Sequence, residues 1–432
     1  MTTETNLRPA LFAIGALEQG ERAEDRARSL AELAKLSEGL GYTIVDQLIA
    51  RRRDGARLFG EGKLEELRER LKEIREDPSF GDERELILIV DDALDPPTQY
   101  QLERALGLPV WDRAGLILRI FESRASTRLA AVEVELARLA YDAPRLRALV
   151  ADDDREGGGG RGGRGHTNID LARQALRDRR VELERELERL RETRATQRAH
   201  RKTLPQVALV GYTNAGKSSL LRALTGSEVY IEDALFATLE ATVRILQPKT
   251  TPKILVSDTV GFIRRLPHEL VASFRSTLEE AREADLLLHV LDASDPEVAE
   301  YQAVTEETLE AIGASADSLL VFNKIDRVDD ETRAALEAAH PEAFFLSAHD
   351  ADSVAQLHAA IVQYFRERFI EEELLIPFTA PRLLAEIRGR AEILAEEYDE
   401  HGARLRIRAS EADIGAFKKE LGLPATADAG VE

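Results

Sequence analysis

Apolar runs alternate with helix-periodic stretches along the first part of the chain. Leu86–Val90 is a continuous apolar run, which is typical of a strand buried in a parallel sheet. Ala10–Gly15 and Tyr42–Ile49 also predict strands. Between these two, Glu21–Gly39 repeats apolar residues three and four positions apart, which predicts a helix closed by a glycine. This order favours a small N-terminal α/β unit with a parallel sheet over residues 1–125.

Two short polar segments in this unit could have a chemical role. Gly60–Lys63 predicts a turn that enters a helix, and it lacks the lysine and serine spacing of a phosphate-binding loop, so a plain turn is favoured. Asp91 and Asp92 follow the Leu86–Val90 strand and could bind a metal ion. We favour the simpler interpretation, that they are strand-end acids capping the segment that follows.

The next region, residues 126–201, predicts two long helices. Each carries an apolar stripe, formed in the first helix by Val132, Leu136, Leu139 and Leu146 and in the second, at every seventh position, by Ile169, Leu176, Leu183 and Leu190. The segment between them, residues 152–165, is acidic at first and then rich in glycine and arginine. Two helices joined in this way favour an antiparallel hairpin whose tip cannot bury apolar area.

Arg161 and Arg164 lie in this glycine-rich tip. They could serve solubility alone, but the tip holds few acids that would neutralise them. Contact with a nucleic-acid backbone needs little more than accessible cations, so we favour phosphate contact for the tip. The arginines of the second helix are interspersed with glutamates, which favours a solvated helix face.

The most specific motif of the chain joins a buried strand, a glycine loop and the start of a helix. The apolar run Val207–Val210 is followed by Gly211, Gly216, Lys217 and Ser218 in the G-x-x-x-x-G-K-S spacing of a phosphate-binding loop. Glycines let backbone N–H groups surround phosphate oxygens, and the helix N-terminus adds unpaired donors and partial positive charge. We expect Lys217 to reach the β- and γ-phosphates and the Ser218 hydroxyl to bind Mg²⁺.

Two further motifs follow in the order expected of a GTP-binding domain. Asp258 and Gly261 form a D-x-x-G after an apolar strand, which predicts Asp258 near Mg²⁺ through water and the Gly261 N–H at the γ-phosphate. Asn323–Asp326 reads N-K-x-D, and the Asp326 carboxylate can accept from guanine N1–H and the 2-amino group, a donor pair that adenine lacks. We therefore predict a GTPase domain over residues 202–369.

The remaining contacts complete the predicted nucleotide site. Asn323 would tie its loop to the phosphate loop, the Lys324 stem would cover the base, and a backbone N–H at Ser347 or Ala348 would reach the guanine oxygen. The full predicted set is Gly211, Tyr212, Thr213, Asn214, Ala215, Gly216, Lys217, Ser218, Ser219, Phe236, Thr238, Asp258, Gly261, Asn323, Lys324, Asp326, Ser347 and Ala348.

A GTPase also needs a threonine that binds Mg²⁺ and closes over the γ-phosphate. Thr238 and Thr242 both lie between the phosphate loop and the D-x-x-G, and we choose Thr238. The predicted magnesium ligands are Ser218, Thr238 and Asp258, and the predicted catalytic residues are Lys217, Thr238 and Gly261.

Two positions bear on the rate of hydrolysis. Phe262 follows Gly261, where a glutamine would orient the attacking water; phenylalanine cannot, so we expect slow intrinsic turnover that a partner accelerates. Asn214 matches the asparagine of potassium-dependent GTPases, in which it helps to hold K⁺ beside the phosphates. K⁺ is therefore a second candidate cofactor, and a plain turn residue is the alternative interpretation of Asn214.

Composition excludes several kinds of site and indicates the cellular location. The chain has 432 residues, no cysteine and a formal net charge of −21. The lack of cysteine excludes disulfides and thiolate metal sites, and the charge argues against nonspecific nucleic-acid binding by the chain as a whole. The start of the chain lacks the apolar core of a signal peptide, and no uncharged stretch approaches the roughly 18 residues of a membrane span. We expect a cytoplasmic monomer without a membrane span.

The last part of the chain, residues 370–432, predicts a small C-terminal α/β domain. Leu374–Ile376 and Arg404–Arg408 predict strands, and two helices are predicted, the first carrying Leu383, Leu384, Ile387 and Ile393 and the last carrying Ile414, Phe417 and Leu421. No catalytic constellation lies in this region.

The nucleotide motifs resemble those of the Obg–HflX branch of the TRAFAC GTPases. The matching stretches are Gly-Tyr-Thr-Asn-Ala-Gly-Lys-Ser at 211–218, Phe-Ala-Thr-Leu at 236–239 and Asp-Thr-Val-Gly-Phe-Ile at 258–263. The whole chain resembles the HflX family, because Leu-Phe-Gly-Glu-Gly-Lys at 58–63, the run from Asp112 to Arg124 and Arg-Asp-Arg-Arg at 177–180 also match. The tip departs from the family pattern, since it lacks the usual proline and glutamate.

This resemblance implies an N-terminal α/β unit with a helical hairpin, a GTPase domain and a C-terminal α/β domain. It also implies GTP-dependent binding to the large ribosomal subunit and its rRNA, in the splitting or rescue of stalled ribosomes. Two alternatives remain at this point. One is a GTP-gated binder of another RNA or of a protein, and the other is separate ATP-driven chemistry in the N-terminal unit, for which the sequence shows no second phosphate loop.

Overall fold

The computed structural model describes residues 9–52, 58–80, 84–156, 165–199, 203–226, 235–236, 242–264 and 275–424. These residues form two compact units. The first unit contains the described residues up to Arg191 together with Leu235, Phe236 and Arg275, and the second contains the others. No described helix is long and apolar enough to cross a membrane.

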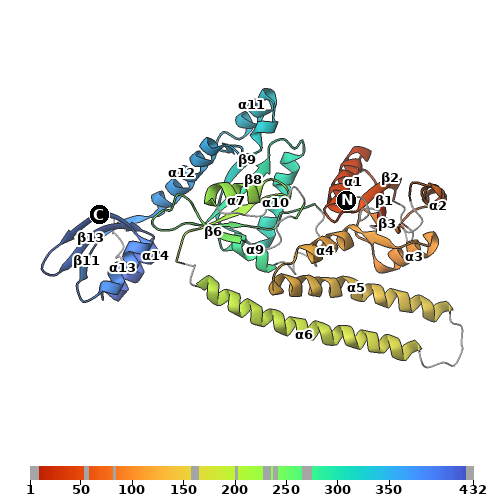
Figure 1. Cartoon of the computed structure of the whole chain (residues 1–432), viewed down its shortest axis with the longest axis horizontal. Coiled ribbons are helices and arrows are strands. Elements are labelled where there is room, and N and C mark those ends of the chain that lie inside the picture. Colours follow the sequence, from red (N-terminus) through yellow and green to blue (C-terminus); the bar gives the residue numbers. More distant parts are fainter. Residues whose placement is uncertain are drawn as a thin grey trace. The chain divides into compact units, whose positions relative to one another are not determined.

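A parallel four-stranded sheet lies at the centre of the N-terminal region, as the alternation of strands and helices predicts (Figure 1). Its strands run in the order β2-β1-β3-β4 and are β1 (Ala10–Leu17), β2 (Thr43–Arg51), β3 (Leu86–Val90) and β4 (Val110–Asp112). The helices are α1 (Ala23–Glu38), α2 (Glu61–Glu76), α3 (Pro96–Leu106) and α4 (Arg113–Arg124). The glycine turn at Gly60 leads into α2 as a plain helix start, as expected.

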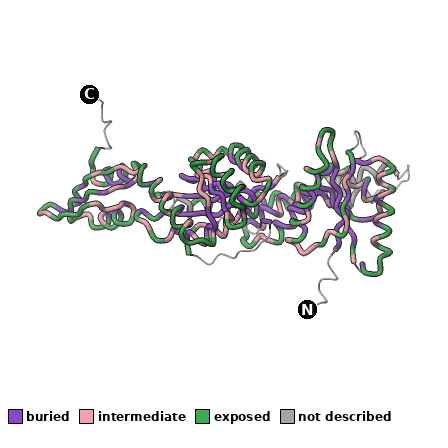
Figure 2. The backbone as a smooth tube through the Cα atoms, turned by 90° about the horizontal axis from the view of Figure 1, so that it is seen from above, coloured by how far each residue is buried: buried purple, intermediate pink, exposed green. Residues whose placement is uncertain are grey.

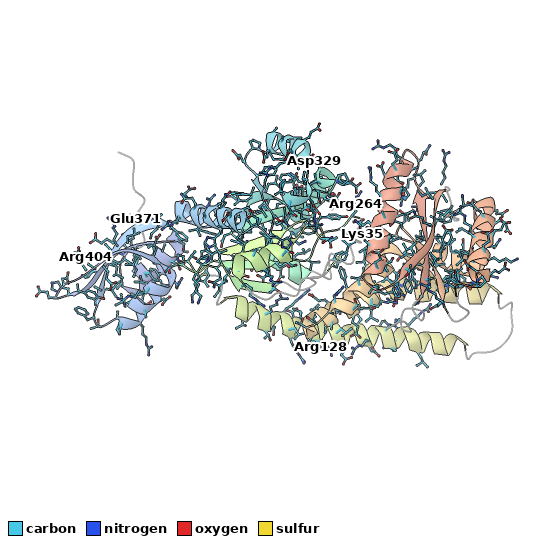
Figure 3. All side chains as sticks on the ribbon, turned by 45° about the horizontal axis from the view of Figure 1, so that its top comes forward. Lys35, Arg128, Arg264, Asp329, Glu371 and Arg404 are labelled. Atoms are coloured by element: carbon cyan, nitrogen blue, oxygen red, sulfur yellow. The ribbon has the colours of Figure 1, made fainter. Side chains whose placement is uncertain are left out.

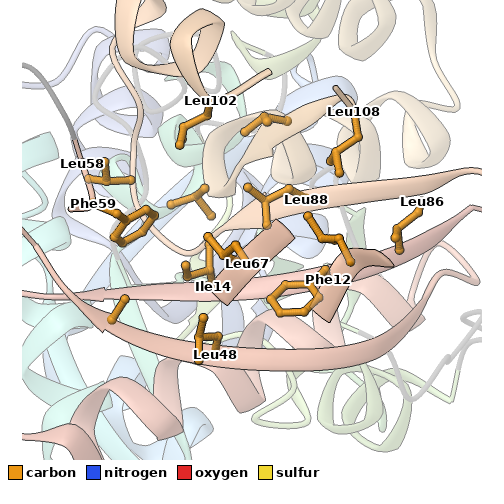
Figure 4. Packing of buried hydrophobic residues seen from close by; sticks show 14 of the residues in the cluster. Phe12, Ile14, Leu48, Leu58, Phe59, Leu67, Leu86, Leu88, Leu102 and Leu108 are labelled. Atoms are coloured by element: carbon orange, nitrogen blue, oxygen red, sulfur yellow. The ribbon is translucent and has the colours of Figure 1, made fainter. Parts of the chain in front are cut away.

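The core of this region is built on the central strands. Every residue of β3 is buried, and Phe12, Ile14 and Leu88 are fully shielded from solvent (Figure 4). Burying one such side chain contributes roughly 1.5–3 kcal/mol. Continuous burial of this kind explains why these strands are recognisable from short apolar runs (Figure 2).

We expected from the sequence that Asp91 and Asp92 would cap the segment that follows. This prediction was wrong, because neither residue caps the next helix, α3. The cap of α3 is Asp95, whose side chain accepts a hydrogen bond from the Thr98 N–H. Asp91 and Asp92 instead pair with arginines: Arg113 reaches Asp91 at 2.7 Å, and Arg26 reaches Asp92 at 3.0 Å.

These two arginines are the largest fully buried side chains of the described chain. Burial alone would lower the pKa of Arg113, but attraction to Glu32 and Asp91 outweighs it and raises that pKa. A buried charge is tolerated only when its partners are in place. The network therefore ties α1 and α4 to the carboxyl end of β3, a connection between distant residues that local pattern cannot show.

The predicted hairpin consists of α5 (Arg128–Glu156) and α6 (Gly165–Ala199). Two bidentate ion pairs join the helices, Arg128 with Glu186 and Glu135 with Arg179, and their inverse order along the chain shows that the helices run antiparallel. Leu183 is fully buried. The tip arginines, Arg161 and Arg164, lie outside the described residues.

The second unit contains a six-stranded sheet in the order β10-β9-β8-β5-β7-β6. Its strands are β5 (Gln206–Val210), β6 (Thr242–Ile245), β7 (Leu255–Asp258), β8 (Leu286–Asp292), β9 (Asp317–Asn323) and β10 (Phe344–Phe345). All are parallel except β6, which pairs antiparallel with β7 and which the sequence did not suggest. The helices are α7 (Lys217–Thr225), α9 (Arg275–Arg282), α10 (Val298–Ile312), α11 (Asp330–Ala339) and α12 (Ala351–Arg368), and η2 (Ile325–Arg327) is one 3₁₀ turn.

The C-terminal region is an antiparallel three-stranded sheet with two helices. The strands are β11 (Ile370–Pro377), β12 (Glu392–Tyr398) and β13 (Gly402–Ala409), and the helices are α13 (Pro381–Arg390) and α14 (Glu411–Glu420). Ile393 lies in β12 opposite Ile407, so our placement of Ile393 on the preceding helix was wrong. Arg404 pairs with Glu373 across the sheet (Figure 3 labels Arg404 and the nearby Glu371).

A buried histidine on β8 should make the stability of the second unit depend on pH. His289 is 2% exposed, and its Nε2 has no hydrogen-bond partner among the described residues. Burial lowers its pKa from 6.5 to about 4, with smaller effects from Glu306 and Lys217. Between these values the unfolded chain binds a proton that the folded chain does not, so stability is lost as pH falls from 6.5 towards 4, by up to about 3 kcal/mol.

We expect His289→Leu to remove this dependence. Urea unfolding of the wild type and of the variant at pH 7, 6, 5 and 4 measures it, and the difference between the two isolates this residue from the acids that also titrate. Parallel stability curves for the two proteins would contradict the assignment.

Candidate functional site

The loop after β5 has the backbone that the glycine spacing predicts. Gly211 and Gly216 have positive φ angles of 143° and 92°. A side chain on Gly211 would overlap the Val290 carbonyl of the neighbouring strand, and one on Gly216 would overlap the Asn323 amide. Only glycine fits both the conformation and the space, so the loop can wrap tightly around the start of α7.

Lys217, the first residue of α7, turns back into this loop. Its ammonium donates to the carbonyls of Gly211 at 3.1 Å and Tyr212 at 2.9 Å. Burial lowers the pKa of Lys217 to about 8. A buried, weakly compensated ammonium favours binding of an anion, because a phosphate beside it would stabilise the charged form.

Ser218 and Asp258 meet at the next position. The Ser218 hydroxyl donates to the Asp258 carboxylate at 2.6 Å, and Asp258 is fully buried at the end of β7. A hydroxyl and a carboxylate side by side are oxygen ligands of the kind that Mg²⁺ prefers, so this pair fits the predicted magnesium site.

One amide connects the base loop to the phosphate loop. Asn323, at the end of β9, is 1% exposed; its Nδ2 donates to the Ala215 carbonyl at 2.9 Å and its Oδ1 accepts from the Ala348 N–H at 3.0 Å. The predicted tie of Asn323 to the phosphate loop is present. We expected the N–H of Ser347 or of Ala348 at the guanine oxygen, and the Ala348 N–H donates to Asn323.

Lys324 adds a second connection. Its φ is +60°, and its ammonium donates to the Asn214 carbonyl and to Asp292, each at 2.7 Å. Asp292 ends β8 and was missed in the sequence, although an acid at the carboxyl end of a buried strand is the signal that could have revealed it. Asn214 itself is exposed and has φ +62°, which asparagine tolerates better than most residues.

Asp326 lies exposed in the 3₁₀ turn η2 after Lys324. A hydrogen bond with the Ser347 side chain holds the pKa of Asp326 below its usual value. The carboxylate is therefore ionised at neutral pH, and both of its oxygens can act as acceptors. This is the state needed to bind two adjacent N–H donors of a purine base.

The D-x-x-G turn lies directly against the phosphate loop. Phe262 donates its N–H to the Gly211 carbonyl at 3.1 Å and accepts from the Thr213 N–H at 2.8 Å. A Cβ placed on Gly261 would lie 2.6 Å from Thr213 Cα and 3.0 Å from Lys217 Nζ. The backbone at Gly261 is thus next to the ammonium that faces the phosphate position.

The other predicted residues have three outcomes. Tyr212, Thr213 and Ala215 are buried in the phosphate loop, and Ser219 lies in the first turn of α7. The ring of Phe236 belongs to the first unit, where it packs edge-on against Phe121 of α4 at 4.8 Å. Thr238 lies outside the described residues, and its rival Thr242 lies in β6 opposite Asp258.

The structure therefore brings together, at the carboxyl ends of β5, β7, β8 and β9, a phosphate loop, an oxygen pair for Mg²⁺ and a guanine-type acceptor. Ligands bind at this edge in parallel α/β sheets. A family model described as "50S ribosome-binding GTPase" matches residues 206–324. The fold and the site define a P-loop GTPase.

Two other family models cover the regions before this domain. One, described as "GTP-binding GTPase N-terminal", matches residues 27–122, and the other, "GTP-binding GTPase Middle Region", matches residues 124–201. A GTPase HflX of Gluconacetobacter diazotrophicus is 46% identical over 91% of this chain and 93% of its own. A GTPase HflX of Magnetococcus marinus is 38% identical over 94% of both chains. The chain belongs to the HflX family of GTPases.

Among solved structures, a GTP-binding protein from Sulfolobus solfataricus in complex with GDP is similar to this chain. It is 26% identical, the match covers 82% of this chain and 99% of that one, and the TM-score is 0.43.

Replacing Asp326 with asparagine should change which base binds. The amide presents one donor where guanine needs two acceptors, so Asp326→Asn should weaken GDP binding about a hundredfold or more. Xanthine carries N1–H beside a carbonyl at C2 and pairs with an amide, so xanthosine diphosphate should bind better to the variant than to the wild type.

Titration of both nucleotides into both proteins measures this exchange. Asp329→Asn is a matched control, because Asp329 caps α11 three residues further on and asparagine caps a helix equally well. Unchanged base preference in Asp326→Asn would refute the placement of guanine.

Proposed function

We propose that this GTPase is a GTP-gated switch that associates with the large ribosomal subunit and acts in ribosome splitting or rescue. The observation that carries the proposal is the match of its nucleotide domain to the family described as 50S ribosome-binding GTPases. The similarity to GTPase HflX relatives over nearly the whole chain supports the same role for the hairpin and the C-terminal region. The site of action would be the cytoplasm.

In this proposal the nucleotide lies along the edge formed by the phosphate loop and the N-K-x-D turn. Backbone N–H groups from Asn214 to Ser219 would hold the phosphates, with the Lys217 ammonium at the β- and γ-oxygens. Asp326 would select guanine, and Asn323 would keep the base loop and the phosphate loop in register. Bound Mg²⁺ supplies charge neutralisation at the phosphates, and Ser218, Thr238 and Asp258 would hold it.

The residue after the D-x-x-G explains why a partner would be needed. Phe262 is 3% exposed, and both of its backbone groups are bonded to the phosphate loop. Its ring has no hydrogen-bonding group for the attacking water. The chain would therefore hydrolyse GTP slowly until a partner orders the missing contacts.

The hairpin is the part that would contact rRNA. The described face of α6 carries Arg177, Arg180 and Arg185, and the tip beyond it carries Arg161 and Arg164. Cations at the end of a long hairpin can reach phosphates even though the chain is acidic overall. A GTP-gated binder of another RNA or of a protein remains the alternative.

Large ribosomal subunits should stimulate GTP turnover by the full chain by about tenfold or more, which is far less than the roughly 10³–10⁵-fold that an arginine finger contributes in other GTPases. Phosphate release is measured with and without purified subunits, and binding is measured by co-sedimentation with a non-hydrolysable GTP analogue and with GDP. Replacing both tip arginines with alanine should reduce the stimulation. Arg333→Ala, which removes a surface cation paired with Glu337 on α11 and outside the hairpin, is the matched control. Lack of stimulation and of co-sedimentation would leave a GTPase with a different partner.

Turnover should also depend on the monovalent cation if Asn214 helps to hold K⁺. We expect a several-fold higher rate in KCl than in NaCl, and loss of this difference in Asn214→Gly. Glycine is the informative variant because it accepts the positive φ of residue 214 and removes only the side chain. Equal rates in the two salts would leave Asn214 as a turn residue.

A further inference from the structure

A cluster of aromatic and charged side chains in the second unit joins the phosphate loop, the end of the D-x-x-G turn and α10. Its members are Tyr212, Arg264, Glu297, Glu300 and Tyr301. Tyr212 belongs to the phosphate loop, Arg264 follows the D-x-x-G turn by three residues, and the others lie at the start of α10. We call this cluster the latch.

Tyr212 is the point where the latch meets the phosphate loop. Its ring stacks on the ring of Tyr301, with centroids 3.9 Å apart and planes at 11°. Its hydroxyl accepts a hydrogen bond from the Arg264 N–H at 2.8 Å. The residue is 4% exposed, so its side chain is buried in the domain against Tyr301 and the Arg264 backbone.

The side chain of Arg264 is held from several directions (Figure 3 labels it). Its guanidinium donates to Glu300 at 2.8 Å and to the Tyr301 hydroxyl at 3.2 Å, and it is bonded to Glu297. The side chain is 13% exposed, and burial by itself would lower its pKa, but the bonds to Tyr301 and Glu297 raise it. Tyr301 in turn donates to Glu297 at 3.0 Å.

This arrangement restrains the short segment between Gly261 and Arg264. One end is bonded to the phosphate loop through the two backbone hydrogen bonds of Phe262, and the other end is clamped by the latch. Gly261 is consequently held beside Lys217, where the γ-phosphate would lie. A donor already in position loses little conformational freedom when its ligand binds.

We propose that Tyr212, Arg264 and Tyr301 are positioning residues for γ-phosphate recognition: the latch pre-orders the Gly261 N–H and thereby sets the affinity for GTP relative to GDP. In this role the side chains of all three would act through the position of Gly261 and not through a contact of their own with the nucleotide. Because the Gly261 N–H can contact only the γ-phosphate, its order matters for GTP and not for GDP. The proposal rests on GTP binding by this site and does not depend on a ribosomal partner.

Weakening the latch should therefore raise the dissociation constant of a non-hydrolysable GTP analogue and leave that of GDP nearly unchanged. Tyr301→Phe keeps the stacked ring and removes the hydroxyl bonds to Arg264 and Glu297. Arg264→Gln removes the ion pairs but keeps the hydrogen bond from the backbone N–H of residue 264 to the Tyr212 hydroxyl. We define the ratio as the dissociation constant of the GTP analogue divided by that of GDP. We expect this ratio to rise about three- to tenfold in each variant, which is the effect of losing one or two buried hydrogen bonds. Arg264→Lys, which retains one ion pair, should restore part of the loss.

The same domain offers a matched control on α12. Tyr364 and Arg368 form a similar group, in which the Tyr364 hydroxyl bonds to Asp317 at 3.0 Å and the Arg368 guanidinium lies 3.6 Å from the centroid of the Tyr364 ring. Tyr364→Phe and Arg368→Gln should leave both dissociation constants unchanged. Titration calorimetry with the full chain, without ribosomes, gives the constants, and thermal unfolding shows whether each variant is folded.

The ratio separates positioning from folding. Equal weakening of GDP and the GTP analogue in the latch variants would mean that the cluster only supports the fold, and an unchanged or lowered ratio would overturn the proposal. If the wild-type chain bound neither nucleotide, the nucleotide site itself would be refuted. A chain with normal ratios that ribosomes do not stimulate would defeat the ribosomal role alone.

Discussion

The geometry of the nucleotide site depends on one buried side-chain amide. Asn323 donates to the phosphate loop at Ala215 and accepts from the loop at Ala348, so a single planar group fixes the distance between three segments far apart in sequence. The residue is 1% exposed, so water cannot replace a lost partner. Leaving either amide group without a hydrogen bond would lower the free energy of unfolding by roughly 1–3 kcal/mol. The amide therefore fixes the spacing of the phosphate loop and the loops at Asn323 and Ala348.

Parallel strands make this arrangement possible. Because β5, β7, β8 and β9 run in the same direction, their carboxyl ends meet at one edge, and each delivers one functional element there: the phosphate loop, Asp258, Asp292 and Asn323. The close packing of backbones at Gly211, Gly216 and Gly261 leaves no room for side chains. The N-terminus of α7 and the Lys217 ammonium lie at this loop, and together they favour an anion.

In both units, buried arginines are paired with carboxylates. In the first unit, Arg26 and Arg113 are buried with carboxylates that follow β3, and in the second, Arg264 is nearly buried with carboxylates of α10. In each case burial opposes the charge and the paired acids compensate for it. Such clusters hold helices at fixed positions against a strand end or loop. In the second unit that fixed position lies next to the nucleotide, which is why the cluster there can influence binding.

The sequence by itself determined the nucleotide chemistry and most of the elements. Two kinds of local pattern revealed the site: the spacing of Gly211, Gly216, Lys217 and Ser218, and the order of the two later motifs. They are visible in the sequence because groups close together along the chain bind the ligand. Buried parallel strands were also recognisable, since a run such as Leu86–Val90 is apolar on both faces. The short strand β6 and the strand around Ile393 were not, because exposed edge residues have no distinctive period.

Only the tertiary structure decided which distant polar residues meet. Asp91 was expected to cap a helix and is an ion-pair partner of Arg113. Nothing in the sequence indicated that the Lys324 ammonium bonds to Asp292, or that Tyr212, placed in the nucleotide site, stacks on Tyr301. These pairings join residues 22 to 89 positions apart. Their energies depend on burial and exact direction, neither of which is encoded in the local pattern of a chain, so they appear only when the fold brings the partners together.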